Sequence, residues 1–399
     1  MTKNILLVSV LTIEIIASDF SLLHPQKQEI RKEKLNEIEA LHKKQKYDWV
    51  APLSLSLSKN KSKSLTSGTY TVDQATVGLN QDIFRSGGIY YTMAFADKQR
   101  NYQLLTWEKE NNELYQQIYT TVVTLKRLNF QLKQSEYRLK NTEIDLFLKQ
   151  EQYKVGSVDM TQLNNAIMDK NDQLKQIITI KESVVSTQKK LKELTPFSLE
   201  EIDTPIFTMI DKDKYIQQNY AINQADIQSD VNFNQYKNTK SNYLPHVSIN
   251  AEVGYQEYNQ KTYNTDYDGN FYATGLSISM PLDFNSNTTI EEQRAAYLQA
   301  KLQIEDEKIT QKAAYEESLD LIKNYQEYIE ITKKNLALYD QLIFITKQGF
   351  QAGYKSGYDL QTIENTQKID VLEIKINESN IQLELIKLHF AQQQRINNG

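Results

Sequence analysis

Apolar residues recur at every seventh position in two separate stretches of the chain. The first series is Ile118, Leu125, Leu132, Leu139, Leu146 and Tyr153, and the second is Tyr315, Ile322, Ile329, Leu336, Ile343 and Phe350. Each series ends three residues before a glycine, Gly156 or Gly353, and one offset of 197 residues relates the two. An unbroken heptad repeat predicts a helix packed in a left-handed supercoil. The two matching series indicate two copies of one unit.

The turn after each glycine carries the signature of a new helix. Asp159 and Gln162 in the first copy occupy the places of Ser356 and Asp359 in the second. Both pairs fit an N-cap residue and the N3 residue of a capping box, so each long helix is expected to turn back into a second one. The predicted helical hairpins cover 88–195 and 287–397.

The length of these helices limits how they can pack. From Ile89 and Thr289 to the glycine turns, each would hold about 65 residues and extend roughly 95 Å. The composition is consistent with this, because the 399 residues include only 12 glycines and 6 prolines, the residues that interrupt helices. We therefore expect an extended assembly of helices.

A period-two alternation precedes each long helix and predicts a pair of strands. The expected strands cover 52–58, 73–84, 245–255 and 271–282, with polar loops at Lys59 to Tyr70 and Gln256 to Asn270. The apolar residues expected to share one face are Leu53, Leu55, Leu57, Val77, Leu79, Val247, Ile249, Val253, Leu276, Ile278 and Met280.

This apolar face has two possible explanations. A soluble sheet would cover it with helices lying across the strands, whereas a membrane barrel would turn it towards lipid. Helices of roughly 95 Å cannot lie across strands of roughly 30 Å, which favours the barrel. Tyr255, Phe271 and Tyr272 fall at the predicted strand ends, where barrels carry aromatic girdles.

The first residues predict a secretory signal over 1–18. Lys3 supplies a positive charge, an apolar run extends from Ile5 to Ile16, and the small Ala17 and Ser18 follow. Glu14 interrupts the apolar run, which leaves a buried N-terminal helix as the alternative. The expected organisation is a signal at 1–18, a first repeat at 19–198, a linker at 199–212 and a second repeat at 213–399.

Charge and chemistry narrow the functional classes. The formal net charge of −5 comes from 46 basic and 51 acidic residues, a balance that does not favour nucleic-acid binding. The chain has no cysteine, so disulfides and thiolate metal sites are excluded. His24, His42, His246 and His389 lack metal-ligand spacing, and no catalytic motif occurs. We predict no enzyme activity, no cofactor and no metal site.

The motifs and their order resemble the TolC family of outer-membrane factors. Leu244-Pro245 opens a strand, Met280-Pro281-Leu282 closes one, and Gln81-Asp82-Ile83-Phe84 resembles the first-half copy of that closing piece. The turns Tyr153-Lys154-Val155-Gly156 and Phe350-Gln351-Ala352-Gly353 complete the likeness. Helix, strand pair, long helix, glycine turn and helix follow in that order twice.

The resemblance implies a fold and a set of partners. It implies an all-α coiled-coil tube joined to a transmembrane β-barrel, built by a homotrimer with four strands per chain and twelve in total. The barrel would contact lipid of the bacterial outer membrane, with the helical part in the periplasm and 199–212 as a belt around it. The partners implied are a periplasmic adaptor (membrane fusion) protein and an inner-membrane pump or ABC transporter.

The resemblance also implies roles for residues at the hairpin turns. Asp359, Lys355 and Phe350 match an acidic, a basic and an aromatic residue at the pore constriction, with Tyr153 and Gln162 as their counterparts in the first hairpin. Thr362 stands where the family carries a second acid, so one acidic ring is expected. The residues expected to dock the adaptor are Gly156, Ser157, Val158, Gly353 and Tyr354. The alternatives are a capping role for Asp359 and plain helix C-caps for the glycines.

The predicted function is a passive exit duct in a tripartite efflux or type I secretion system. A secreted structural coiled-coil protein is the main alternative, and it explains the heptads but not the four matching strands. A periplasmic adaptor would have one helical hairpin rather than two. A soluble enzyme has no supporting residues.

Overall fold

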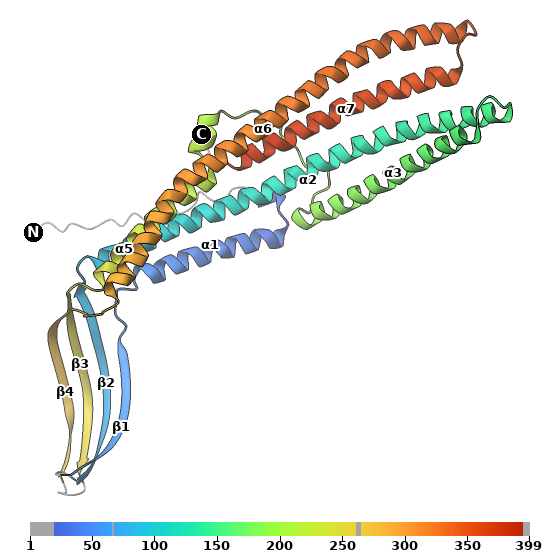
Figure 1. Ribbon diagram of the computed structural model, residues 1–399. Helices are drawn as coiled ribbons and strands as arrows, with labels where there is room; N and C mark the ends of the chain where they lie inside the picture. Colours follow the sequence, from blue (N-terminus) through green and yellow to red (C-terminus); the bar gives the residue numbers. More distant parts are fainter. Residues whose placement is uncertain (1–19, 66–67, 261–264, 394–399) are drawn as a thin grey trace, which may run out of the picture. The chain divides into compact units, whose positions relative to one another are not determined.

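The computed structural model describes residues 20–65, 68–260 and 265–393. The expected signal at 1–18 lies outside these residues. After a short 3-10 helix at Phe20–Leu22, the helices are α1 (Pro25–Lys46), α2 (Gly88–Lys154), α3 (Met160–Leu194), α4 (Lys212–Gln217), α5 (Tyr220–Ser241), α6 (Ser286–Gln351) and α7 (Gly357–Phe390). The strands are β1 (Ser54–Ser64), β2 (Gly68–Phe84), β3 (His246–Gln260) and β4 (Thr265–Ser279). Figure 1 shows this order along the chain.

The two long helices are continuous, with 67 residues in α2 and 66 in α6. Neither contains a proline, so no backbone donor is missing along their length. Their heptad residues are most buried far from the glycine turns: Ile118 is 0% exposed and Ile322 is 6% exposed. Near the turns Tyr153 and Phe350 are about half exposed, at 44% and 48%. The heptad stripe therefore packs within this chain over part of its length only.

The four strands form one antiparallel sheet in the order β1-β2-β3-β4 (Figure 1). The strands are longer than the alternation predicted, and much of the two expected polar loops is strand. Lys59 pairs with Asp73, and Tyr255 and Asp268 lie well inside paired segments. Ladder hydrogen bonds require only backbone partners, so pairing continues after the apolar alternation ends. At the other end β4 stops at Ser279, before Pro281, whose missing N–H cannot extend a ladder.

The chain divides into two compact units that cut across the two predicted repeats. Among the described residues, one unit takes its members from 20–32, 109–218 and 312–393, and the other from 33–108 and 219–311. Each unit therefore takes residues from both halves of the sequence. The first holds both glycine turns, and the second holds the sheet.

The unit with the glycine turns has two main apolar clusters. Ile118, Val122 and Leu125 of α2 pack with Leu191 of α3, while Ile322 of α6 packs with residues of α7. The linker at 199–212 contributes to both clusters. Its members there are Ile202 and Phe207. Phe207 also donates its backbone N–H to Gln382 Oε1 at 2.9 Å and accepts from Gln382 Nε2 at 3.2 Å. The linker is thus packed onto the helices by both apolar and backbone contacts.

The unit with the sheet is held together at its helices by charged pairs. Arg100 of α2 donates to both carboxylate oxygens of Glu39 on α1, and Lys98 lies 2.5 Å from Asp230 on α5. His42 Nε2 lies 2.7 Å from Asp97. Burial opposes ionisation of Asp97, but its hydrogen bonds to His42 and Lys46 outweigh this and lower its pKa. Among the described residues, none of the helices has a stretch both long and apolar enough to span a membrane.

Candidate functional site

The two glycine turns share one backbone geometry. Gly156 and Gly353 have φ values of 75° and 78°, in the left-handed region, and a Cβ at either position would meet nothing within 4 Å. In the first turn the N–H of Ser157 donates to the carbonyl oxygen of Gln152 at 2.9 Å, and the N–H of Gly156 donates to the carbonyl oxygen of Tyr153 at 3.0 Å. These two bonds define a Schellman motif, in which glycine supplies the left-handed residue without strain.

The second turn repeats this arrangement 197 residues later in the sequence. The N–H of Tyr354 bonds the carbonyl of Gly349 at 2.8 Å, and that of Gly353 bonds Phe350 at 3.1 Å. Both hairpins therefore turn at a glycine in the left-handed conformation. The open space around each glycine means that its backbone conformation, rather than crowding, requires the residue type.

The capping box predicted for the second hairpin is confirmed. Ser356 Oγ accepts from the Asp359 N–H at 3.1 Å, and Asp359 Oδ2 accepts from the Ser356 N–H at 2.9 Å. In the first hairpin Asp159 Oδ1 accepts from the Gln162 N–H at 2.9 Å, and the exposed Gln162 supplies the N3 position. The capping box predicted for the first hairpin is therefore only half formed: Asp159 makes the N-cap bond, whereas the Ser356 pair makes the reciprocal bond as well.

Asp359 is an exposed carboxylate with local partners. The backbone and side-chain hydrogen bonds from Ser356 hold its pKa below the ordinary value, and the positive charge of Lys355 adds to this effect. The carboxylate therefore remains ionised at neutral and mildly acidic pH. Its capping bonds provide a structural reason for an acid here, and its exposure leaves an oxygen available to solvent.

Other predicted tip residues divide into exposed and packed groups. Tyr354 is 87% exposed. Ser157 Oγ donates a hydrogen bond to the carbonyl oxygen of Gln152 at 2.9 Å, and the next residue along the chain, Val158, is half-buried. In the second turn Phe350 lies against Gly357, and the aliphatic stem of Lys355 lies against Gly349. Phe350 and Lys355 thus both pack within their own turn.

A polar ladder between α2 and α7 was not predicted. Its rungs are Arg127 to Asn380 at 2.9 Å, Gln134 to Glu373 at 2.6 Å, and Asn141 to Thr366 at 3.3 Å. On each helix the three residues are seven apart and the two helices run in opposite directions, so the same heptad geometry that aligns the apolar residues aligns these. The sequence does show these polar residues at heptad spacing on each helix. A single sequence does not show which residues of another helix they contact, so the ladder could not be predicted from it.

The sheet separates two kinds of side chain. Directly paired residues share a face in an antiparallel sheet, and the register aligns Leu55, Val77, Val253 and Tyr272 in one such row. The neighbouring row on the opposite face contains Ser54, Gly78, Glu252 and Ala273. The predicted apolar residues that lie within the strands therefore share one face, which we call the apolar face; the other is the polar face. Met280 and Leu53 lie just outside the strands.

One aromatic prediction requires correction. Tyr255 and Tyr272 are on the apolar face, whereas Phe271 is on the polar face, with its ring close to Gly254. Phe271 therefore cannot belong to an outward girdle with the two tyrosines. All three also lie inside strands rather than at strand ends, because the pairing extends beyond the apolar alternation.

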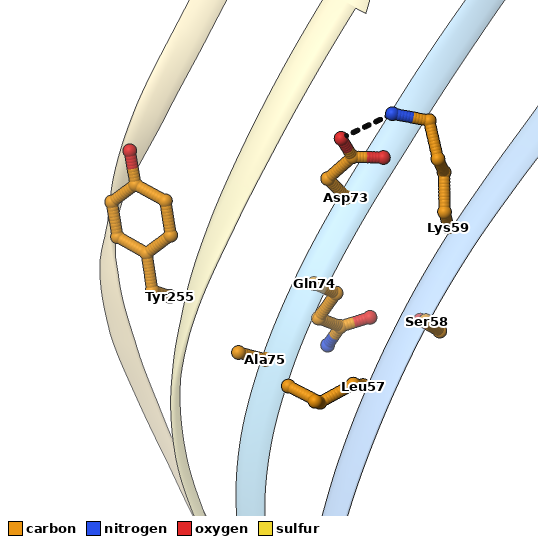
Figure 2. Close-up of a pocket in the computed structure, with 7 residues that line it drawn as sticks. All are labelled: Leu57, Ser58, Lys59, Asp73, Gln74, Ala75 and Tyr255. Carbon is orange, nitrogen blue, oxygen red and sulfur yellow. Dashed lines mark hydrogen bonds and ion pairs between the residues drawn. The ribbon is translucent and has the colours of Figure 1, made fainter.

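A shallow depression on the sheet lies where the apolar rows of the apolar face end; we call these apolar rows, from Ile278 to Leu57, the apolar band. Figure 2 shows Leu57, Ala75 and Tyr255 beside the ion pair of Lys59 and Asp73, whose atoms are 2.8 Å apart. In the register, Leu57, Ala75 and Tyr255 form one row of the apolar face, and Lys59 and Asp73 belong to the next row on that face. The face thus changes from apolar to charged within one step along the strands.

The described residues contain no group of three or more histidine, cysteine or carboxylate side chains arranged to hold a metal ion. The main features of this part of the chain are two capped hairpin turns, an exposed apolar sheet face and a polar sheet face. These define a helix-rich chain with a four-stranded sheet of the kind found in outer-membrane channels.

Comparison with known proteins supports that class. Residues 213–382 match the family described as outer membrane efflux protein. Comparison with curated proteins finds no match. Among solved structures, VceC of Vibrio cholerae is 17% identical, with 92% of each chain covered and a TM-score of 0.69.

Two further structures extend the likeness. The CmeC outer membrane channel of Campylobacter jejuni is 14% identical over 94% of this chain and 84% of that one, with a TM-score of 0.71. The open state of the MtrE channel of Neisseria gonorrhoeae is 12% identical over 91% and 85%, with a TM-score of 0.56. The family match and these folds confirm the resemblance to TolC-like outer-membrane factors.

Proposed function

We propose that this chain is one subunit of a trimeric outer-membrane channel, the passive exit duct of a tripartite efflux or type I secretion system. The observation that carries the proposal is the exposed apolar face of the sheet. Leu57 and Ile278, from the two edge strands, are 76% and 74% exposed. Burying a side chain of this kind contributes about 1.5–3 kcal/mol, so the face requires an apolar environment. Membrane lipid supplies one.

The edges of the sheet support assembly with further copies. Within the described residues β1 and β4 each pair on one side only, and an open edge invites pairing with another chain. Four strands cannot enclose a barrel, for which about eight is the smallest number. Three copies would supply twelve strands, the number that the family resemblance implies.

Exposed apolar residues on the helices support the same assembly. Ile178 of α3 is 57% exposed, and Leu302 and Ile309 of α6 are 73% and 70% exposed. In the proposed trimer the helices of neighbouring copies cover these residues and complete a periplasmic tube. The order helix, strand pair, long helix and helix occurs twice, which supports an origin by internal duplication.

The hairpin turns are the proposed contact with the rest of the exporter. Gly156, Ser157, Val158, Gly353 and Tyr354 would dock a periplasmic adaptor that joins the channel to an inner-membrane pump or ABC transporter. Asp359 would contribute one of three carboxylates at the constriction, with Lys355, Phe350, Tyr153 and Gln162 around it. The backbone geometry that the two turns share and the exposure of Tyr354 support this role. We propose no enzymatic activity.

Membrane fractionation followed by native mass spectrometry in detergent tests the proposal. We expect the full chain, expressed in a bacterium, in the outer-membrane fraction as a homotrimer that dissociates on heating. A secreted structural coiled coil, the alternative function, would be recovered outside the membrane fraction. Recovery of a water-soluble monomer would overturn the proposed channel.

A further inference from the structure

The strand register sorts charged residues between the two faces of the sheet. The apolar face carries Lys59, Lys61, Lys63, Asp73, Glu257, Asp266 and Asp268, all beyond the apolar band. The polar face carries two carboxylates, Asp82 and Glu252, and within the described strands it carries no lysine or arginine. The side of the sheet that would face the lumen is therefore acidic, and no lysine or arginine within the described strands shares that side.

The two carboxylates of the polar face differ in their surroundings. Asp82 lies near the end of β2, and its Oδ2 is 3.5 Å from Nε of Arg85. Glu252 lies in the middle of β3, and no hydrogen bond or ion pair of its side chain occurs among the described residues. Asp82 is thus partly balanced by a cation of its own chain, and Glu252 is not.

The neighbours of Glu252 leave its side chain room to extend from the sheet. Gly78 on β2 and Ala273 on β4 pair directly with it. Gly254, on the same face of β3, must remain small because a Cβ there would lie 2.6 Å from the Ala75 carbonyl oxygen. The two residues that pair directly with Glu252 are therefore small, and its half-buried side chain keeps a part of its surface accessible to solvent.

We propose that Glu252 determines the charge selectivity of the barrel lumen, so that the channel favours cationic cargo and disfavours anionic cargo. This inference rests on the proposed trimeric channel, in which three copies of Glu252 lie at one level of the lumen. A ring of carboxylates in a pore attracts cations and repels anions, and walls of low dielectric strengthen the effect. The lysines, which lie on the opposite face, do not oppose it there.

Reversal potentials of the purified trimer in planar bilayers test this inference. The gradient should use dilute KCl, because the Debye length is about 30 Å at 0.01 M and about 10 Å at 0.1 M. We expect a K⁺ to Cl⁻ permeability ratio above one that rises as the salt is diluted. Glu252→Gln should bring the ratio several-fold closer to one, and Glu252→Lys should reverse the preference.

The chain offers a matched control on the same strand. Glu257→Gln removes the same charge from the apolar face and should leave the ratio unchanged, and Asp359→Asn measures any contribution from the helical tip. Equal ratios for the parent and Glu252→Gln channels, or equal losses in Glu252→Gln and Glu257→Gln, would overturn the inference while leaving the channel itself intact. Absence of any conductance from correctly assembled parent trimers would instead remove the proposed function and the inference with it.

Discussion

The side-chain amide of Gln134 on α2 donates a 2.6 Å hydrogen bond to the carboxylate of Glu373 on α7. Gln134 is only 5% exposed, and the bond lies between an equivalent contact of Arg127 on one side and one of Asn141 on the other. Polar contacts between two helices specify their alignment more strictly than interchangeable apolar contacts, because each buried group needs its own partner. The ladder therefore fixes the register of α2 against α7.

We expect removal of the central rung to destabilise the helical unit. Gln134→Ala leaves a partly buried carboxylate without this donor, which costs about 1–3 kcal/mol. The thermal unfolding midpoint followed by circular dichroism should fall, whereas Gln150→Ala, at an exposed position of the same helix, should leave it nearly unchanged. Equal midpoints for both variants would show that the rung contributes nothing to stability.

The turn at Gly353 should tolerate asparagine better than valine. Valine in the left-handed region is strained by about 1–2 kcal/mol, whereas asparagine adopts this conformation more readily. In a strain that depends on this channel, Gly353→Val should abolish resistance to exported compounds while the trimer yield on gels is preserved. Full resistance with Gly353→Val would contradict the docking role of the turn.

Asp359 should confer block by multivalent cations from the periplasmic side. Because its pKa is lowered by Ser356, the carboxylate stays charged as the pH falls past the ordinary value of about 3.9, and block should persist down to that range. The same lowered pKa means that its stabilising contribution is present above the ordinary pKa and is lost as the pH falls through the folded value. Asp359→Asn should weaken block in single-channel recordings at every pH above this range. Unchanged block would reduce Asp359 to its capping role.

Adjacent residues on β3 should respond very differently to arginine. Ile249 pairs with Leu276 on the apolar face, while Asn250 pairs with Asn80 and Gly275 on the polar face. An arginine that faces the middle of the membrane costs about 2–4 kcal/mol, so Ile249→Arg should lower the yield of heat-labile trimer and Asn250→Arg should largely preserve it. Similar yields for the two variants would mean that the sheet does not separate lipid from lumen.

Local patterns in the sequence determined much of this structure. The heptads of α2 and α6 predicted the long helices, since a helical period is encoded by neighbouring residues. Gly156 and Gly353 predicted where the two long helices turn back, and Ser356 with Asp359 predicted the capping box, because each depends on residues only a few positions apart. The alternation in β3 also predicted which of Ile249 and Asn250 lies on the apolar face.

The tertiary structure decided what depends on residues distant in sequence. The extension of β1 to Ser64 follows from its pairing with β2. The apolar pattern does not encode this extension, because polar residues alternate there with other polar residues. The partner of Gln134 lies 239 positions away, and its heptad spacing alone fits several neighbouring helices. The sequence by itself determined the periodic elements and their turns, whereas the register between elements required the fold, because register is a property of two segments and periodicity is a property of one.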